Sequence, residues 1–178
     1  MAVSDVPGGI FSGDGLDIPS VGKHVAETRT VSGFPGAESI SNADLLICDC
    51  EVLIPAAIGH VLTDQNAREV KAHYVIEAAN GPCTAEADEI FRSRNVLCVP
   101  DIFANGGGVT VSYFVWAQKT QKYKWSESKV NDELEQHMVD AQTRLRRVMN
   151  VYNIPMRTAA FVFAVEEVKK ATEGRGFE

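Results

Sequence analysis

Four small or polar signals stand where apolar runs of this sequence end. Asp5 closes AVSD, Ala56 lies in the Pro-Ala-Ala that follows VLI, Asn80 follows VIEAA, and Asn105 follows VPDIFA. A carboxylate accepts hydrogen bonds, whereas a carboxamide offers both a donor and an acceptor. Each signal alone has a plain alternative, since Asn-Gly usually marks a turn and Asp5 could cap one. Together, at successive strand ends, they favour a ligand cleft.

Three consecutive glycines, Gly106–Gly108, precede an apolar run, although a helix interior tolerates glycine badly. Glycine lets the backbone approach a ligand closely, and a helix that begins near Gly108 points free N–H groups at an anion. Val109 and Ser112 are spaced i, i+3 on one helical face, which suits a carboxylate on a short aliphatic stem. The alternative is a turn after which Ser112 bonds back to the helix backbone. The residues alone leave both interpretations open.

The elements that must position these residues alternate between apolar runs and helical patterns. Strands are predicted within LLICDCEVLIPAA, HYVIEAAN and VLCVPD, whose continuous apolar character is typical of parallel strands. Helices are predicted over 17–28, from Thr63 over TDQNAREV, and over 84–95, with Asp17 and Thr84 as N-caps and Asn95 as a C-terminal cap. This alternation predicts an α/β fold with a doubly wound parallel sheet.

Two further helices are predicted in the last third of the chain. Apolar residues recur at helical spacing from Ser128 to Val148, and a second helical pattern follows Pro155 and ends near Gly174. We interpret both as packing helices. The single histidines, His24, His60, His73 and His137, are scattered and are interpreted as surface or packing residues.

Composition argues against two classes of partner. Acidic residues outnumber basic ones by 24 to 17, for a net charge of −7, and no block of Lys and Arg resembles a phosphate-binding footprint, so nucleic acid is not expected. The apolar stretches are shorter than a membrane span, and the first ten residues show no targeting pattern, so we expect neither a membrane partner nor a targeting segment. The four cysteines are expected to be reduced thiols of an intracellular protein: Cys48, Cys50, Cys83 and Cys98.

Several segments resemble, in order, the C-terminal dinucleotide-binding half of glutamate dehydrogenases, of the Glu/Leu/Phe/Val dehydrogenase family. They are AVSD, DGLDIP, PAA, EAANGP, ADEI, PDIFANGGGVTVSYF and VNDEL, they run from Ala2 to about Gly176, and they are most similar to the plant NAD-dependent type. The segment VTVSYF favours glutamate over the leucine and phenylalanine types. The resemblance implies NAD as cofactor, with NADP possible. It also implies a homo-oligomeric parent enzyme that converts L-glutamate to 2-oxoglutarate and ammonia by hydride transfer.

The resemblance assigns cofactor contacts to four positions. Asp5 matches the acid that contacts the adenosine ribose, and Ala56 matches an alanine that lines the cofactor site. Asn80 and Asn105 match the asparagines around the nicotinamide and its ribose. No metal site is implied.

The resemblance also implies a substrate-binding pair. Val109 and Ser112 match the residues that receive the substrate side chain, with the serine reaching its distal carboxylate. Two positions depart from the family pattern. Gly106 stands where the family usually has alanine, and Val115 stands where it usually has glutamate, which removes a charge near the site.

A glycine fingerprint normally lies roughly 20 residues before the strand-end acid, but Asp5 has only four residues before it. We therefore expect a partial Rossmann-like doubly wound parallel sheet that lacks its first βα unit. This truncated dinucleotide-binding domain is expected over 1–127, with C-terminal helices over 128–178 packing back on the same domain.

The catalytic lysine and aspartate of the family belong to an N-terminal substrate domain that this chain lacks, so we expect the isolated chain to be inactive. The alternative is a non-catalytic module, derived from a dehydrogenase, that binds nucleotide or docks onto subunits. A plant-type parent would be mitochondrial.

Overall fold

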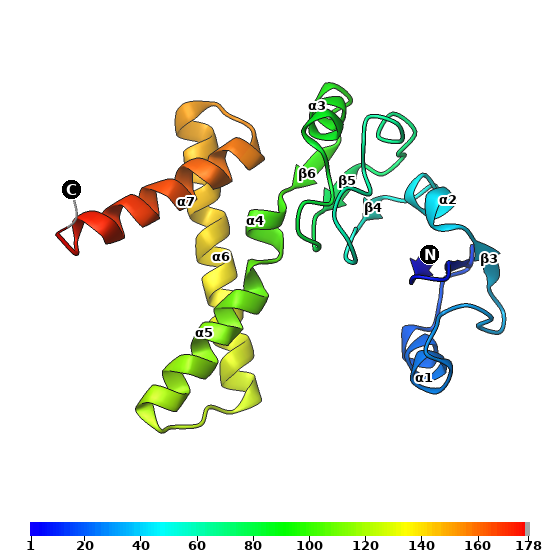
Figure 1. The fold of residues 1–178 in the computed structure, drawn as a ribbon, viewed down its shortest axis with the longest axis horizontal. Coiled ribbons are helices and arrows are strands. Elements are labelled where there is room, and N and C mark those ends of the chain that lie inside the picture. The colour runs from blue at the N-terminus through cyan, green and yellow to red at the C-terminus, as the bar shows by residue number, and fades with distance from the viewer. Residues whose placement is uncertain (177–178) are drawn as a thin grey trace. The chain divides into compact units, whose positions relative to one another are not determined.

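The structure, a computed structural model, describes residues 1–176 (Figure 1). The chain folds into two compact units. The first unit contains Met1–Leu53, His60–Val75 and Cys83–Leu97, and the second contains Ile54–Gly59, Ile76–Pro82 and the chain from Cys98 onward. The second unit holds residues on both sides of the predicted boundary between 127 and 128.

The first unit begins with a three-stranded antiparallel sheet. Strands β1 (Ala2–Ser4), β2 (Gly9–Phe11) and β3 (Glu38–Ile40) pair in the order β1-β2-β3. The chain reverses directly after β1 because the Asp5 N–H donates to the Gly8 carbonyl at 2.9 Å and Gly8 has a φ of 151°. The interpretation of Asp5 as the end of a parallel-sheet strand is therefore corrected, because within residues 1–176 β1 pairs with β2 of its own antiparallel hairpin.

Two helices accompany this sheet. Helix α1 (Ile18–Thr28) follows the predicted N-cap Asp17, with Pro19 in its first turn, and helix α2 (Asn42–Leu46) begins after Ser41, whose hydroxyl accepts the Asp44 N–H at 3.0 Å. Ile10 of β2 and Val21 of α1 form the core here together with Val31. LLIC of the first predicted strand region lies in α2 and the turn that follows it.

The predicted parallel sheet is confirmed farther along the chain. It contains β4 (Val52–Leu53), β5 (Tyr74–Ile76) and β6 (Leu97–Val99) in the order β4-β5-β6. Helix α3 (Ala85–Ser93) precedes β6, and the Thr84 hydroxyl accepts the Ala87 N–H at 3.2 Å as the predicted N-cap. The fold class is therefore α/β, with parallel strands at β4–β6 and one further parallel bridge between Leu62 and Cys83.

The helix predicted from Thr63 is wrong. Residues 64–69 form turns, and the carboxamide of Asn66 bonds the Thr63 N–H at 2.9 Å and the Val61 carbonyl at 2.8 Å. The Arg94 guanidinium donates to the Ala67 carbonyl at 2.6 Å. Two helical backbone bonds remain, from the Ala67 N–H to the Thr63 carbonyl and from the Val70 N–H to the Asn66 carbonyl, but they form turns and not a continuous helix.

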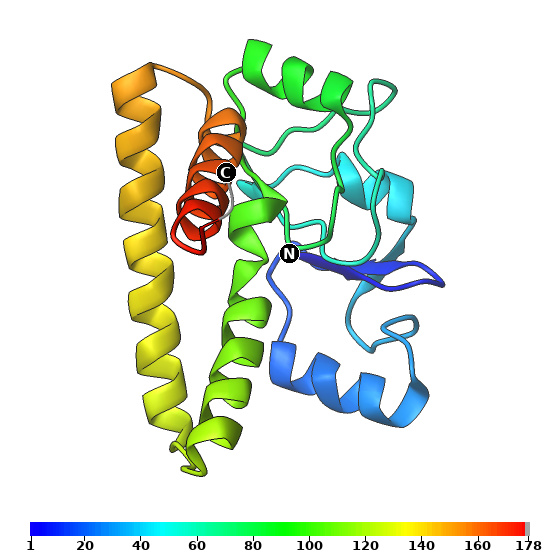
Figure 2. The ribbon, with the colours of Figure 1, turned by 60° about the vertical axis from the view of Figure 1, so that its left-hand side comes forward.

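The second unit is mainly helical (Figure 2). Helix α4 (Asp101–Ala104) is followed by α5 (Gly106–Gln121), α6 (Glu127–Tyr152) and α7 (Met156–Glu173). Helix α6 lies beside α5 and α7, as Figure 2 shows. Leu145 of α6 and Ala159 and Ala160 of α7 form a buried cluster against which Phe103 of α4 packs. Both predicted C-terminal helices are confirmed, and they anchor α4 and the residues on either side of it.

Among residues 1–176, none of the helices combines the length and the apolar character needed to cross a membrane. The four cysteines in this part of the chain are free thiols, and each is half-buried.

Candidate functional site

Asn80 and Asn105 lie in contact within the second unit. Asn80 follows β5, and Asn105 stands between α4 and α5. The Asn105 Nδ2 atom donates to Asn80 Oδ1 at 2.7 Å and reaches the Ala79 carbonyl at 3.4 Å. A carboxamide has two donor hydrogens and two acceptor positions, so this contact leaves the pair with capacity for a ligand. The structure thus brings together two of the predicted site residues.

The segment that carries Ala56 runs alongside Asn80. The carbonyl of Pro55 accepts the N–H groups of Ala78 at 3.1 Å and Ala79 at 2.9 Å. Farther along this segment, a Cβ atom added to Gly59 would lie 2.9 Å from the Asn80 carbonyl oxygen, which explains the glycine by close backbone approach. Ala56 is exposed beside this contact. Three of the predicted residues, from three segments, therefore lie in one region.

A buried carboxylate, Glu77, lies at the base of this region. Its side chain is fully buried, and Arg157 of α7 binds it with both terminal nitrogens, Nη2 to Oε1 at 2.5 Å and Nη1 to Oε2 at 3.0 Å. The thiol of Cys98 donates to Oε1 at 3.3 Å. A two-pronged arginine contact of this kind neutralises a buried carboxylate and fixes its orientation.

Asp101 connects this ion pair to the turn beyond Asn80. Its backbone N–H donates to Glu77 Oε2 at 2.9 Å, and its own Oδ2 accepts the Gly81 N–H at 2.7 Å. Arg157 Nη1 also lies 3.7 Å from Asp101 Oδ1. Asp101 and Glu77 therefore hold the first turn of α4 and the residues after β5 in a fixed relation.

Sequence reasoning missed Glu77, Asp101 and Arg157. A signal existed for Glu77, because an acid inside the apolar run YVIEAA must be paired if the run is buried. Its partner stands 80 residues away, at a spacing that no local pattern reveals.

The three glycines form the first turn of α5. A Cβ atom added to Gly106 or Gly108 would meet no atom within 4 Å, so open space adjoins the backbone there. Val109 is 75% exposed, and Ser112 is exposed with its Oγ donating to the Gly108 carbonyl at 3.0 Å. Ser112 thus bonds back to the helix backbone, as the alternative interpretation expects. The open space at Gly106 and Gly108 remains compatible with a ligand. The substrate-binding role of Val109 and Ser112 stays a prediction.

Asp5 belongs to the first unit and is already hydrogen-bonded there. Its carboxylate accepts the Val31 N–H at 2.7 Å and the Thr30 hydroxyl at 3.2 Å. The side chain therefore fastens the loop after α1 to the end of β1. The predicted ribose contact of Asp5 stays a prediction.

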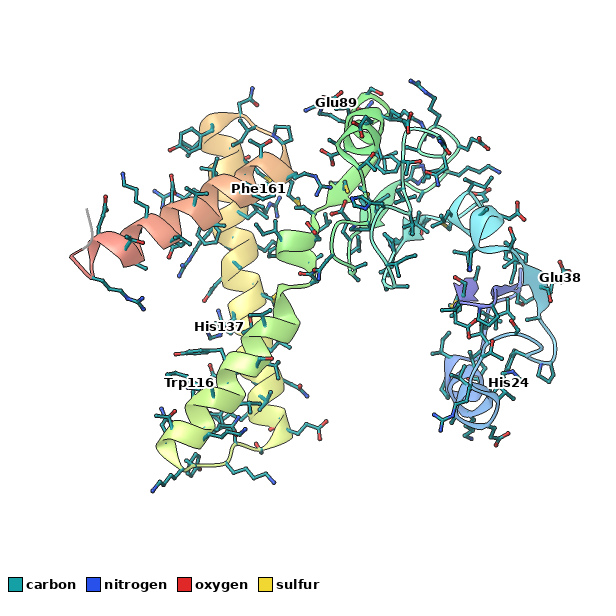
Figure 3. All side chains as sticks on the ribbon, viewed as in Figure 1. His24, Glu38, Glu89, Trp116, His137 and Phe161 are labelled. Atoms are coloured by element: carbon teal, nitrogen blue, oxygen red, sulfur yellow. The ribbon has the colours of Figure 1, made fainter. Side chains whose placement is uncertain are left out.

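Two of the predicted packing histidines have aromatic neighbours. His24 of α1 lies edge-on to Phe34 with ring centroids 5.6 Å apart, and His137 of α6 lies edge-on to Phe114 at 5.2 Å; Figure 3 labels both histidines. The half-buried His24 and the exposed His137 agree with the interpretation of the histidines as surface or packing residues.

A cavity of about 420 Å³ lies among α4, α5, α6 and α7. It is lined by Gly106 but by none of the predicted ligand-binding residues, and its floor is largely apolar. The candidate site therefore rests on hydrogen-bonding geometry rather than on this cavity.

Two groups outside the site have shifted pKa values. Burial, reinforced by the neighbouring Cys48, raises the pKa of the Cys50 thiol. At the start of α3, hydrogen bonds from its own backbone N–H and from Thr84 lower the pKa of the exposed Glu86 carboxyl.

Comparison with known proteins identifies the family. The family model described as "Glutamate/Leucine/Phenylalanine/Valine dehydrogenase" matches residues 1–176. The chain belongs to this family. A glutamate dehydrogenase of Thermotoga maritima is 44% identical to it over 176 residues, which are 99% of this chain and 42% of the relative. The chain thus spans less than half the length of this relative.

Solved structures of the same family are similar in fold. The hetero-hexameric glutamate dehydrogenase of Thermus thermophilus, in its Leu-bound form, has a TM-score of 0.88 at 28% identity, over 96% of this chain and 40% of that protein. The glutamate dehydrogenase of Peptoniphilus asaccharolyticus has a TM-score of 0.80 at 28% identity, over 98% and 40%. The closer similarity to the plant type stays a prediction.

Membership in the Glu/Leu/Phe/Val dehydrogenase family makes this chain part of an amino-acid dehydrogenase family and implies a nicotinamide dinucleotide cofactor. The residues present fit one end of such a cofactor. Asn80 and Asn105 offer amide donors and acceptors, and the open space at Gly106 and Gly108 leaves the adjoining backbone accessible.

Proposed function

We propose that this chain is the NAD(P)-binding portion of a glutamate dehydrogenase that oxidatively deaminates L-glutamate to 2-oxoglutarate and ammonia. The observation that carries the proposal is the Asn80–Asn105 amide pair, set beside open helix-start backbone in a member of this family. The 44% identity to a relative named glutamate dehydrogenase supports glutamate as the substrate. We favour NAD as the cofactor, with NADP as the alternative.

In this proposal four residues hold the cofactor. Asn80 and Asn105 bind the nicotinamide and its ribose, Ala56 lines the site, and the Asp5 carboxylate accepts a hydrogen bond from the adenosine ribose. The bound cofactor supplies hydride transfer. The amide pair orients the nicotinamide end, since its two carboxamides are already fixed relative to each other by a 2.7 Å hydrogen bond.

Substrate recognition is assigned to the first two turns of α5. Val109 receives the aliphatic stem of glutamate, and Ser112 exchanges its bond to the Gly108 carbonyl for one to the distal carboxylate. The rest of the enzyme, outside this chain, supplies the proton-transfer groups, so the 178-residue chain alone does not oxidise glutamate. In the assembled enzyme the parent chain is a homo-oligomer.

The test is cofactor binding by the purified chain, measured by titration of NADH fluorescence and, in parallel, by competition with ADP. Asn80→Ala and Asn105→Ala each weaken NADH binding by about tenfold, the loss of one or two hydrogen bonds, and leave ADP binding within about twofold. Asn150→Ala, an exposed asparagine of α6, is the matched control and binds both as the wild type does. Absence of NADH binding by the wild type, or equal binding by the three variants, would overturn the proposal.

A second candidate is a docking module for dehydrogenase subunits. Val109, Tyr113 and Trp116, at helical spacing on α5, are 75%, 59% and 60% exposed, and Figure 3 labels Trp116 on this helix. Exposed apolar stripes mark interaction surfaces. If docking is the function, the chain co-sediments with full-length glutamate dehydrogenase subunits, Trp116→Ser abolishes the complex, and no NADH binding is found.

A further inference from the structure

The Glu77–Arg157 ion pair connects the C-terminal helix α7 to both candidate cofactor asparagines. Arg157 stands in the first turn of α7, and Glu77 is the residue directly after β5. Their contact joins positions 80 residues apart, and Glu77 is fully buried whereas the Arg157 side chain is 23% exposed. Buried ion pairs often add little net stability, but a two-pronged pair also fixes the orientation of the groups that it joins.

Hydrogen bonds lead from this pair to the backbone at both asparagines. Glu77 Oε2 accepts the Asp101 N–H, and Asp101 Oδ2 accepts the N–H of Gly81, the residue after Asn80. The Asp101 carbonyl accepts the Asn105 N–H at 3.1 Å. One buried carboxylate therefore fixes Asp101, which fixes the backbone at both asparagines.

We propose that Arg157 is a positioning residue for the nicotinamide end of the cofactor, acting through Glu77 and Asp101 on Asn80 and Asn105. The inference rests on the proposed function, because it assigns the nicotinamide to this amide pair. The guanidinium fork fixes the orientation of the Glu77 carboxylate plane, and in that orientation Oε2 accepts the Asp101 N–H. A lysine ammonium at the same place would neutralise the charge without fixing the plane.

The first experiment compares NADH and ADP binding by the full chain with Arg157→Lys and Arg157→Met. ADP lacks the nicotinamide and its ribose, so a positioning role weakens NADH binding by about tenfold while ADP binding stays within about twofold. Arg147→Met replaces an exposed arginine of α6 in the same unit and serves as the control, with both affinities unchanged.

A merely structural role predicts a different pattern, because a damaged fold loses NADH and ADP together. Charge neutralisation alone predicts that Arg157→Lys binds NADH as the wild type does. Either result overturns the inference. The lysine variant keeps the positive charge beside Glu77 and so remains informative if the methionine variant fails to fold.

The second experiment needs no cofactor and separates this inference from the proposed function. Amide hydrogen exchange at Gly81 and Asp101 accelerates by about tenfold in Arg157→Lys, since the acceptors of both N–H groups are no longer fixed. The Thr84 amide, which donates to the Leu62 carbonyl in the first unit, exchanges at the wild-type rate. Unchanged exchange at Gly81 and Asp101 contradicts the positioning role. If the wild type binds no NADH, the proposed function fails, and these rates still decide whether Arg157 fixes the two turns.

Discussion

The two strand ends that carry candidate cofactor residues are built in different ways. After β1, the Asp5 carboxylate is held by a backbone N–H and a hydroxyl of one loop, residues 30 and 31. After β5, the backbone around Asn80 is held by side chains from two other elements, α4 and α7. The first arrangement occupies the acceptors of the candidate residue itself, whereas the second fixes its surroundings and leaves its amide for a ligand.

This difference shows how the surroundings of a side chain can be fixed while part of its hydrogen-bonding capacity stays available. The Asn80 side chain accepts a hydrogen bond from Asn105, while the fixed geometry comes from Glu77 and Asp101 below it. A site residue whose support lies in neighbouring groups keeps its hydrogen-bonding capacity for the ligand. The Asp5 carboxylate already accepts two hydrogen bonds, so fewer of its acceptor positions remain for a further donor.

The largest expected effect is on stability, and it tests whether the structure after β5 depends on the Glu77–Arg157 ion pair. Arg157→Met lowers the free energy of unfolding by about 3–5 kcal/mol, because the substitution leaves the Glu77 carboxylate buried without its cation. The cost lies nearer the lower limit, since the Arg157 side chain is partly exposed. Lys169→Met, which breaks a pair exposed on both sides, costs under about 0.5 kcal/mol. Urea unfolding of the purified variants measures both, and equal costs would remove the contrast.

The next effect concerns substrate choice by Ser112. The test uses a chimera in which a full-length relative supplies the rest of the enzyme. There Ser112→Ala lowers kcat/KM for glutamate by a factor that corresponds to about 1–3 kcal/mol of transition-state stabilisation, because the distal carboxylate of the substrate loses its hydrogen-bond partner. Activity towards norvaline, which lacks the carboxylate, falls much less. Steady-state kinetics with both amino acids decide the point, and an equal loss would make Ser112 a structural residue bonded only to Gly108.

A smaller effect, of opposite sign, is expected at the glycines of α5. Gly108→Ala stabilises the chain by about 0.5–1 kcal/mol, since alanine is the better helix former and the added methyl meets no atom. The same change weakens ligand binding if the backbone must be approached closely. Gly59→Ala is the counterpart: its methyl would press on the Asn80 carbonyl at 2.9 Å, so it destabilises. Thermal unfolding and NADH titration of both variants test the pair, and a destabilised Gly108→Ala would contradict the open backbone.

The smallest effect lies in the first unit and depends on pH. Because burial and Cys48 raise the pKa of the Cys50 thiol, less thiolate is present near neutral pH, and its alkylation is slower than that of an ordinary cysteine. Cys48→Ala lowers this pKa and accelerates labelling of Cys50 severalfold at about pH 8, close to the ordinary thiol pKa. Mass spectrometry of iodoacetamide-treated protein follows the reaction, and an unchanged rate would show that Cys48 has no influence.

The sequence predicted what depends on neighbours along the chain. The N-cap Thr84, the helices after Ser128 and Pro155, and the strands β5 and β6 all follow from local patterns and are confirmed. The helix predicted from Thr63 is wrong: the segment forms turns, and the Arg94 guanidinium takes its Ala67 and Val70 carbonyls from a distant part of the chain. The antiparallel pairing of β1 depends on a tight turn at Gly8, and the sequence alone did not reveal the backbone conformation of this turn.

The sequence predicted the candidate ligand-binding residues of the site but not the ion pair that supports them. Asn80 and Asn105 were predicted as neighbours because strand ends converge in an α/β sheet, and the structure places them in contact. Their cofactor role stays a prediction. Arg157 could not be found, since its importance depends on a packing arrangement that brings α7 to the end of β5. A long-range ion pair leaves no periodic pattern in the sequence from which it could be predicted.

Because Glu77 precedes Arg157 by 80 residues, the two partners of the ion pair are synthesised at different times. A ribosome adds about 5–20 residues each second, so the carboxylate emerges roughly 4–16 s before its cation, which lies 80 residues later. During that interval burial of Glu77 is disfavoured, and water must solvate the end of β5. The ion pair that supports the turns at Asn80 and Asn105 therefore forms only after the start of α7 has been synthesised, and a nascent chain cut short before Arg157 lacks the cation that binds Glu77.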